Sequence, residues 1–142
     1  MDEYDGYFRV VTSSWSPIHN ELYILQEDES TDELKIVGSI KQGLGKVNET
    51  VKSVRFNEDE AYVVTFEQTD PFYVINLSNP LLPIVEGELI IPGYSAYLQP
   101  LGENYILGIG YGDSDGGTAG MKIAIFDVSD KSNPVILGEE VI

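Results

Sequence analysis

The sequence predicts an all-β protein assembled from a repeated unit, and two observations carry that prediction. The first is a segment that occurs three times, at residues 21–40, 71–90 and 122–141: an apolar strand, a polar turn rich in Ser, Asn, Asp and Pro, and a second strand. A period of about fifty residues is typical of solenoids and propellers. The second is that β-branched and aromatic residues come in short runs bounded by Gly, Pro, Asn and Asp, which is the pattern of strands. We therefore expect strands throughout and no helix.

Eleven strands are expected in chain order. They cover residues 7–12, 21–26, 34–40, 51–56, 61–66, 72–77, 84–91, 95–100, 104–110, 121–128 and 135–141. Short turns such as residues 57–59 and 78–80 join neighbouring strands, and their Asn, Asp, Ser and Pro residues have backbone preferences that suit tight turns. Strands joined in this way pair antiparallel, and four of them in each repeat are the sequence form of a propeller blade.

The repeats also predict where the chain enters this array. Residues 59–66 align with residues 103–109 and with residues 5–12, so the chain is expected to open at the second strand of a blade. The prediction is a β-propeller-like array of about three four-stranded antiparallel blades, the first lacking one strand, in a partial β-propeller domain over residues 1–142. The expected blades are approximately residues 6–40, 51–91 and 95–141. Because closed rings have about four to eight blades, we expect either a strand supplied from elsewhere or a segment of a longer protein, with self-association through open blade edges.

Composition excludes several classes of partner. The chain has 8 Lys and Arg against 24 Asp and Glu, a net charge of −16, which repels nucleic acid and anionic lipid surfaces. It has no cysteine, so disulfides and thiolate metal sites are excluded. No apolar run approaches the roughly 20 residues that span a bilayer, so no membrane insertion is expected in this segment. The first ten residues lack the basic start and apolar middle of a signal peptide.

A glycine-rich loop at residues 110–120 is the least usual stretch of the sequence. Asp113 and Asp115 alternate ahead of Gly116, which resembles the opening of a calcium loop. The twelfth position counted from Asp113 is Ala124, however, where an EF-hand has a bidentate Glu. We therefore favour a polar connection between strands, keep calcium as the alternative, and expect no other metal or cofactor.

Three tyrosines form the other candidate site. Tyr94, Tyr97 and Tyr111 lie in or near loops that follow strand ends, and together with Trp15 they could form an aromatic platform for a sugar or a peptide. Tyr and Trp suit such a role because they combine a large apolar area with a polar group. The alternative is that these aromatics pack one blade against the next, as recurrent bulky residues do in repeat proteins.

Three motifs carry a resemblance to a known family. They are the T-F-x-Q-x-D-P stretch at residues 65–71, I-P-G-Y-S at residues 91–95 and F-D-V-S-D at residues 126–130. With the surrounding residues 51–110 and 122–134, they resemble the secreted C-terminal β-propeller domain family of bacteria and archaea. The resemblance implies a larger propeller on an exported or surface-attached protein, hence an extracellular or cell-surface location, and it carries over no catalytic residue.

Two functions remain open at this stage. The first is a non-catalytic surface module that binds protein or carbohydrate or spaces other domains. The second is part of a polysaccharide hydrolase or lyase whose catalytic residues lie outside this chain. Glycosidases need two carboxyl groups roughly 5–9.5 Å apart, and the strands expected to be innermost, residues 51–56 and 95–100, offer Lys52 and Arg55 but no carboxylate. Binding is therefore favoured over catalysis.

Overall fold

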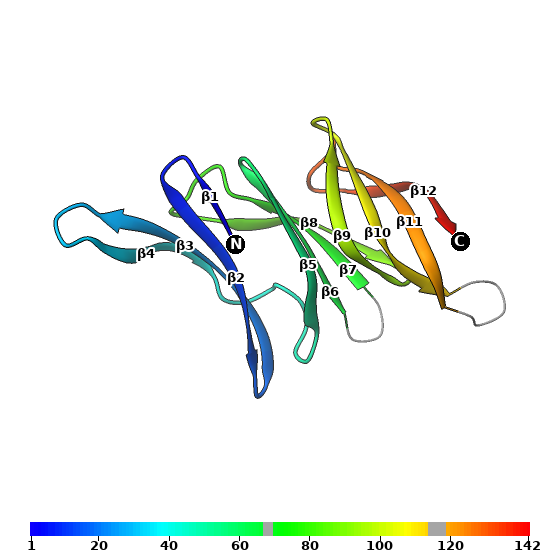
Figure 1. Cartoon of the computed structure of the whole chain (residues 1–142), viewed down its shortest axis with the longest axis horizontal. Coiled ribbons are helices and arrows are strands. Elements are labelled where there is room, and N and C mark those ends of the chain that lie inside the picture. Colours follow the sequence, from blue (N-terminus) through cyan, green and yellow to red (C-terminus); the bar gives the residue numbers. More distant parts are fainter. Residues whose placement is uncertain (67–69, 114–118) are drawn as a thin grey trace.

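The computed structural model describes residues 1–66, 70–113 and 119–142, and this part of the chain is made of strands and turns without a helix (Figure 1). Twelve strands are present in these residues. They are β1 (Asp2–Tyr4), β2 (Tyr7–Trp15), β3 (Ile18–Asp28), β4 (Glu33–Ile40), β5 (Thr50–Asn57), β6 (Glu60–Phe66), β7 (Asp70–Asn76), β8 (Ile84–Ile91), β9 (Tyr94–Leu101), β10 (Tyr105–Asp113), β11 (Ala119–Asp127) and β12 (Val135–Val141). The all-β prediction is confirmed.

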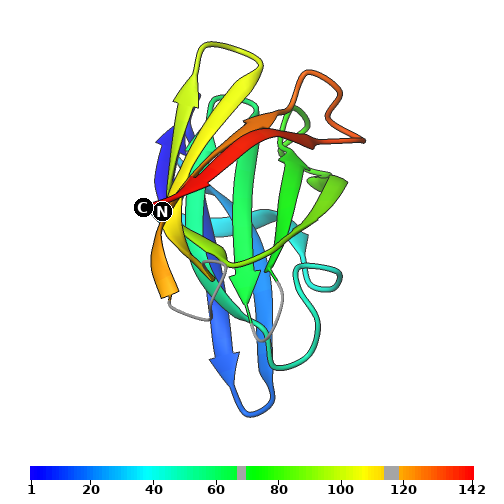
Figure 2. The same ribbon diagram turned by 90° about the vertical axis from the view of Figure 1, so that its right-hand side faces the viewer.

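The strands form three sheets, each a four-stranded antiparallel meander. Blade 1 has the order β1-β2-β3-β4, blade 2 the order β5-β6-β7-β8, and blade 3 the order β9-β10-β11-β12. The three blades stand side by side (Figure 1), and their first strands β1, β5 and β9 lie along one edge of the array, which is the left edge of Figure 2. The array of four-stranded blades predicted from the repeats is therefore present.

One detail of that prediction is wrong, because blade 1 does not lack a strand. Strand β1 pairs with β2 in the register Asp2↔Arg9 and Tyr4↔Tyr7. The turn between the two strands is Asp5-Gly6, with φ angles of 51° and 79°. Two successive residues with positive φ are the signature of a type I′ hairpin, for which Asp-Gly is a favoured pair. A three-residue strand is too short to show a period in the sequence, which is why the alignment missed it.

The third and fourth strands of every blade share one irregularity. The register shifts by a residue between Ile24 and Leu25 in blade 1, between Val74 and Ile75 in blade 2 and between Ile125 and Phe126 in blade 3. In each blade a glycine stands opposite the residue before the shift: Gly38 opposite Ile24, Gly87 opposite Val74, and Gly138 opposite Ile125. These three positions align the blades residue by residue.

Two apolar cores hold the blades together. Between blades 1 and 2 the core contains Leu22, Ile24, Ile40, Leu44, Ala61, Val63, Tyr73, Ile75 and Leu77. Between blades 2 and 3 it contains Tyr62, Val64, Phe72, Val74, Ile91, Leu98, Ile106, Ala124, Phe126 and Val128. Strand β6 contributes to both cores, which explains why residues 61–65 are an unbroken buried run rather than an alternating one. The rings of Phe72 and Phe126 stack across the second core with centroids 4.7 Å apart.

A loop between the third and fourth strands fastens blade 2 to blade 1 and blade 3 to blade 2. We call residues 77–83 of blade 2 and residues 128–134 of blade 3 the docking loops. A Cβ atom placed on Gly87 would lie within 3.0 Å of the Lys131 carbonyl oxygen and 2.9 Å from Pro134 Cδ. A Cβ atom on Gly38 would meet the backbone of Pro80 and the ring of Pro83 in the same way. The glycine and the proline that recur in the repeat therefore contact each other between neighbouring blades.

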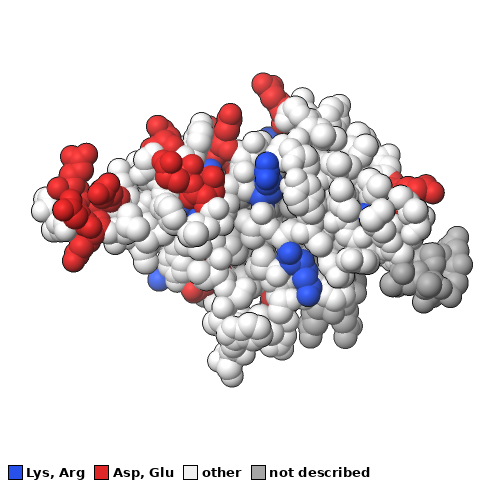
Figure 3. Space-filling model, viewed as in Figure 1, with Lys and Arg blue, Asp and Glu red and all other residues white. Residues whose placement is uncertain are grey.

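Blade 1 has no such loop. Its β3–β4 hairpin continues the ladder to the pair Asp28↔Glu33 instead of bending away, and residues 27–34 contain no proline. Five of these eight residues are Asp or Glu, and Figure 3 shows acidic side chains gathered over this end of the molecule. Blade 1 therefore provides a glycine, Gly38, for the docking loop of blade 2, but it has no docking loop of its own.

Two tyrosines in the cores give the fold a predictable response to alkali. Burial, with help from the Glu60 carboxylate that accepts the Tyr62 hydroxyl, raises the pKa of Tyr62 well above 10. Burial together with the charges of Glu88 and Glu49 raises the pKa of Tyr73 to about 12. A raised tyrosine pKa means that the folded state holds the proton more tightly than the unfolded state does. This stabilising contribution is complete below pH 10 and is lost as the pH rises through the folded-state pKa values.

We expect alkaline unfolding to begin above about pH 10, with late ionisation of these two among the nine tyrosines. Titration followed by tyrosinate absorbance and by circular dichroism checks this. Tyr62→Phe removes one ionising group but keeps its ring, so it should move unfolding to higher pH. Unfolding at the same pH in both proteins would contradict the assignment.

Candidate functional site

We call the edge of the array that holds β1, β5 and β9 the inner edge. An aromatic cluster lies where blades 2 and 3 meet, near the last residues of β6 and β10 and the first residues of β9. The cluster consists of Phe66, Tyr94 and Tyr111, with Lys52 beside it. The Phe66 and Tyr94 ring centroids are 5.3 Å apart, and those of Tyr94 and Tyr111 are 5.6 Å apart. The Lys52 ammonium nitrogen stands 5.5 Å from the Phe66 centroid and 5.6 Å from that of Tyr94. These distances are within the range of aromatic pairing and cation–π attraction.

The backbone brings these side chains together in two ways. Tyr94 opens β9 directly after Gly93, whose φ of 75° is a conformation that L side chains rarely adopt. A Cβ atom on Gly93 would collide with the backbone of Tyr111, so the glycine allows β9 and β10 to approach and Tyr94 to pair opposite Tyr111. Phe66 reaches Tyr94 from the neighbouring blade. The cluster is therefore a product of blade packing.

The cluster has a protected side and an accessible side. Tyr94 is half-buried and packs against the core between blades 2 and 3, whereas Tyr111 is 53% exposed and Lys52 is exposed. Figure 3 shows basic side chains over the middle of the face on which β5 and β9 lie, in a molecule that is otherwise acidic. The arrangement combines ring faces with a positive charge, which suits a ligand with an apolar face and polar or anionic groups.

The predicted aromatic residues are only partly brought together. Tyr94 and Tyr111 are neighbours, as the platform hypothesis requires. Tyr97 is 50% exposed on β9 opposite Ile109, and its hydroxyl donates to Gln99 Oε1 at 2.7 Å outside the cluster. Trp15 is 85% exposed in the β2–β3 hairpin of blade 1, where it is opposite Ile18.

The calcium hypothesis falls largely on residues that the structure does not describe. Asp113 is the last residue of β10, and its side chain is outside the described part; Asp115 lies outside the described residues altogether. Among the residues that are described, no group of three or more His, Cys, Asp or Glu side chains could hold a metal ion. Calcium binding by this loop stays a prediction.

Sequence reasoning missed Phe66 and Lys52. Phe66 and Tyr111 occupy the same position in the repeat. Val74 and Ile125 correspond, because each lies opposite the recurring glycine of its blade. Their partners Tyr62 and Leu107 therefore correspond as well, and Phe66 and Tyr111 each follow four residues later. An alignment anchored on those glycines would have paired the two aromatic residues. The sequence predicted Lys52 only as a cation on an inner strand, because its contact to Tyr94 joins two blades.

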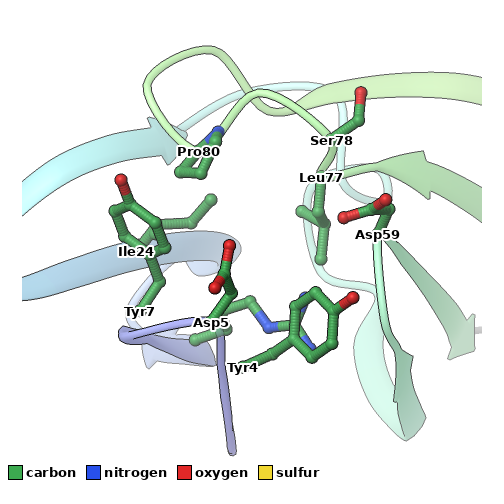
Figure 4. A pocket seen from close by; sticks show the side chains of 9 residues that line it. Tyr4, Asp5, Tyr7, Ile24, Asp59, Leu77, Ser78 and Pro80 are labelled. Carbon is green, nitrogen blue, oxygen red and sulfur yellow. The ribbon is translucent and has the colours of Figure 1, made fainter.

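A second candidate is a cavity of about 180 Å³ between blades 1 and 2 (Figure 4). Arg9 lines it and is almost fully buried, although it is charged. Its guanidinium donates to the Asp2 carboxylate and to the Glu58 carbonyl oxygen, and it stands 5.1 Å from the ring centroid of Tyr4 and 5.2 Å from that of Phe56. The Nε atom has no hydrogen-bond partner among the described residues. Arg9 therefore serves mainly to tie β1 to the tip of blade 2.

The carboxylates of Asp5 and Asp59 face this cavity from two hairpin turns (Figure 4). Partial desolvation, followed by the charges of Asp59, Glu58 and Asp5, raises the pKa of the Tyr4 phenol. The buried Arg9 cation offsets part of that negative field, so the cavity combines both signs of charge and selects no single class of ligand. We regard it as a structural junction.

A polysaccharide hydrolase would need two neighbouring carboxyl groups on the inner edge. Strands β5 and β9 carry none, as expected. Strand β1, which the sequence analysis missed, adds Asp2 and Glu3. Asp2 is paired with Arg9. The described inner edge therefore does not offer the two neighbouring uncommitted carboxyl groups that glycoside hydrolysis needs.

Three four-stranded antiparallel blades, packed face to face with their first strands along one edge, define part of a β-propeller. Comparison with known families agrees, since the family model described as "Beta propeller domain" matches residues 1–142. The chain belongs to this family. None of the described residues forms a helix long and apolar enough to cross a membrane.

Two archaeal proteins are clearly related to this chain. An uncharacterized protein of Archaeoglobus fulgidus is 44% identical over 135 residues, which are 94% of this chain and 20% of that protein. An uncharacterized protein of Methanocaldococcus jannaschii is 48% identical in an alignment 139 residues long, which covers 94% of this chain and 21% of that protein. The chain thus spans about a fifth of the length of the curated relatives it matches.

Proposed function

We propose that this β-propeller segment is a non-catalytic binding module of an extracellular or cell-surface protein, and that the aromatic cluster with Lys52 is its binding site. The observation that carries the proposal is the contact between Tyr94 and Tyr111, with an exposed ammonium group beside them. Carbohydrate is the favoured ligand, and a protein segment is the alternative.

The chemistry of the cluster supports this choice. An exposed tyrosine ring offers a flat apolar surface on which the C–H face of a sugar ring can stack, and its hydroxyl can exchange hydrogen bonds with the sugar. Lys52 can donate to a hydroxyl group or pair with a carboxylate of the ligand. Because Tyr94 is already held by the core, little conformational entropy is lost when a ligand binds it.

The proposal predicts that Tyr111→Ala and Lys52→Ala each weaken ligand binding by about tenfold or more, which corresponds to about 1.4 kcal/mol. The measurement is a screen of the protein on glycan and peptide arrays, followed by titration of the best ligand. Tyr97→Ala is the matched control, because Tyr97 is an equally exposed tyrosine on the same blade outside the cluster. Equal losses in all three variants, or no ligand on either array, would contradict the proposal.

The alternative is that the chain forms part of a polysaccharide hydrolase or lyase whose catalytic residues lie outside it. The length of the relatives, about five times the matched segment, gives such proteins room for a catalytic site elsewhere. A panel of chromogenic polysaccharide substrates, tested on a full-length relative, separates the two functions. Turnover of any of these polysaccharides would favour the enzyme, and no turnover together with ligand binding by this chain would favour the binding module.

Two further expectations remain proposals. Self-association through open sheet edges follows from the unpaired backbone groups of outer strands such as β4 and β12. Exclusion of nucleic acid follows from the net charge of −16.

A further inference from the structure

Half of the basic residues of this acidic chain lie in one short segment, residues 41–55, which we call the basic segment. Four of the 8 Lys and Arg residues are in it: Lys41, Lys46, Lys52 and Arg55. Its single acidic residue is Glu49, so four positive charges and one negative charge give the segment a formal charge of +3, whereas the whole chain carries −16. Positive charge is therefore concentrated at one place.

The charges of the basic segment are not neutralised within the described structure. Each of the other four basic residues pairs with a carboxylate: Arg9, Lys35, Lys122 and Lys131. In the segment, the three lysines are exposed and form no ion pair with a described residue, and Arg55 Nε has no described hydrogen-bond partner. Glu49 is only 3% exposed, and its carboxylate accepts the Lys46 backbone N–H and the Thr65 hydroxyl. Free cations at a surface attract an anionic partner.

The basic segment lies between two aromatic positions. It links blade 1 to blade 2 and then supplies most of β5. On the side of blade 3, Lys52 stands beside the aromatic cluster. On the side of blade 1, Thr50 and Val51 line a cavity of about 130 Å³ together with Trp15. The same strand therefore touches an aromatic site at each of its two blade junctions.

Trp15 lies near the place that Phe66 holds in the aromatic cluster. Arg9 and Tyr62 correspond in their blades, because each pairs with the residue opposite the recurring glycine. Four residues later these strands reach Ser13 and Phe66, and Trp15 follows after two more residues on the same face of the strand. Each junction thus has an aromatic ring from the second strand of one blade beside the first strand of the next.

The loop at the start of the basic segment is attached to the Trp15 hairpin. The Asn48 backbone N–H donates to the Ile18 carbonyl oxygen at 3.2 Å, and Ile18 lines the same cavity as Trp15. Lys46, which is exposed, comes two residues before Asn48 in this loop. Both aromatic positions therefore have a lysine in a neighbouring segment.

We propose that the two junctions and the basic segment form one extended site for an acidic polysaccharide that carries uronate carboxylates. The extended site rests on the function proposed above, and it adds the charge of the ligand, a minimum length and a second stacking position. One sugar ring stacks on Trp15 and another on Tyr111, and carboxylates between them accept from Lys46 and Lys52.

Spacing and charge density select this class of ligand. Packed sheets lie about 10 Å apart, so a ligand that reaches two neighbouring junctions is longer than one sugar ring. A uronate chain has at most one charge on each ring. Nucleic acid has charges about every 1.7 Å of duplex, so the acidic remainder of the molecule repels it more strongly.

Titration of polygalacturonate and alginate oligosaccharides of increasing length tests the proposal. Methyl-esterified polygalacturonate is the matched ligand, because it keeps the sugar chain and loses the charge. We expect affinity for the acidic chains to increase with length until both junctions are reached, and to fall with added salt. The methyl ester should bind about tenfold more weakly, without the salt dependence.

Two substitutions locate the binding on the protein. Trp15→Ala should weaken binding of the longer acidic chains about tenfold and abolish the gain with length, and Trp15→Phe should restore most of it. Lys46→Ala should weaken binding about threefold. Lys35→Ala is its matched control, because it removes the same charge from β4, outside the basic segment.

The outcomes separate this proposal from the proposed function. Equal affinity for the methyl ester, or no effect of Trp15→Ala, overturns the extended acidic site, while a loss in Tyr111→Ala would still support the binding module. Tighter binding of single-stranded DNA than of polygalacturonate also overturns it, because the partner is then nucleic acid. Failure to bind any saccharide or peptide overturns both proposals.

Discussion

Replacement of Phe126 by alanine is expected to lower the free energy of unfolding by about 3–5 kcal/mol, the usual cost of removing a buried phenylalanine ring. Phe126 is fully buried and stacks on Phe72 of the neighbouring blade, so its loss leaves a cavity in the contact between blades 2 and 3. Urea denaturation followed by circular dichroism measures the change.

Ile125→Ala provides the control for this prediction. Ile125 is adjacent in sequence but lies on the other face of blade 3, outside the core between blades 2 and 3, and is 38% exposed. Its truncation removes less buried area, so it should cost clearly less than the loss of the ring. Similar losses in the two variants would mean that Phe126 does not hold the blades together.

Gly87→Ala is expected to lower the free energy of unfolding by about 1–3 kcal/mol, although it adds a single methyl group. That methyl group would overlap the carbonyl of Lys131, which is backbone and cannot turn away as a side chain end could. Its matched control is Gly138→Ala, at the same register in blade 3, where no described atom lies within 4 Å. We expect the control to change stability by no more than about 0.5 kcal/mol.

The comparison of these two glycines distinguishes a packing effect from a backbone effect. If both substitutions cost the same, the cause lies in the strand conformation that the positions share, and the docking-loop contact is not the reason for glycine. Gly38→Ala in blade 1, which meets Pro80 and Pro83, should behave like Gly87→Ala. Chemical denaturation of the three variants gives the answer.

Most of the fold could be predicted because its information is local and repeated. Each blade is a meander of adjacent strands, so turn residues and apolar runs suffice to place residues 50–91 and 94–141. Strand β1 could not be found in this way, since three residues show no period and its pairing depends on the Asp5-Gly6 turn and on Arg9. The Asp-Gly pair was interpreted as part of an aligned segment rather than as a hairpin turn.

The site was less predictable, because its contacts join different blades. The pair Tyr94 and Tyr111 follows from strand pairing within blade 3, and was proposed from their nearness to strand ends. Phe66 and Lys52 approach Tyr94 from blade 2, and a contact of this kind depends on how sheets stack. Tyr97 was grouped with the others by position in the sequence, but its hydroxyl is bonded to Gln99.

The glycine and the proline loop that meet at each junction belong to opposite faces of a blade, and blades 2 and 3 each carry both. A duplication of one whole unit in the gene therefore inherits a matched pair of attachments and needs no compensating change elsewhere. Arrays whose units touch only their neighbours tolerate such growth. Variation in size among relatives is then expected to come in steps of about fifty residues.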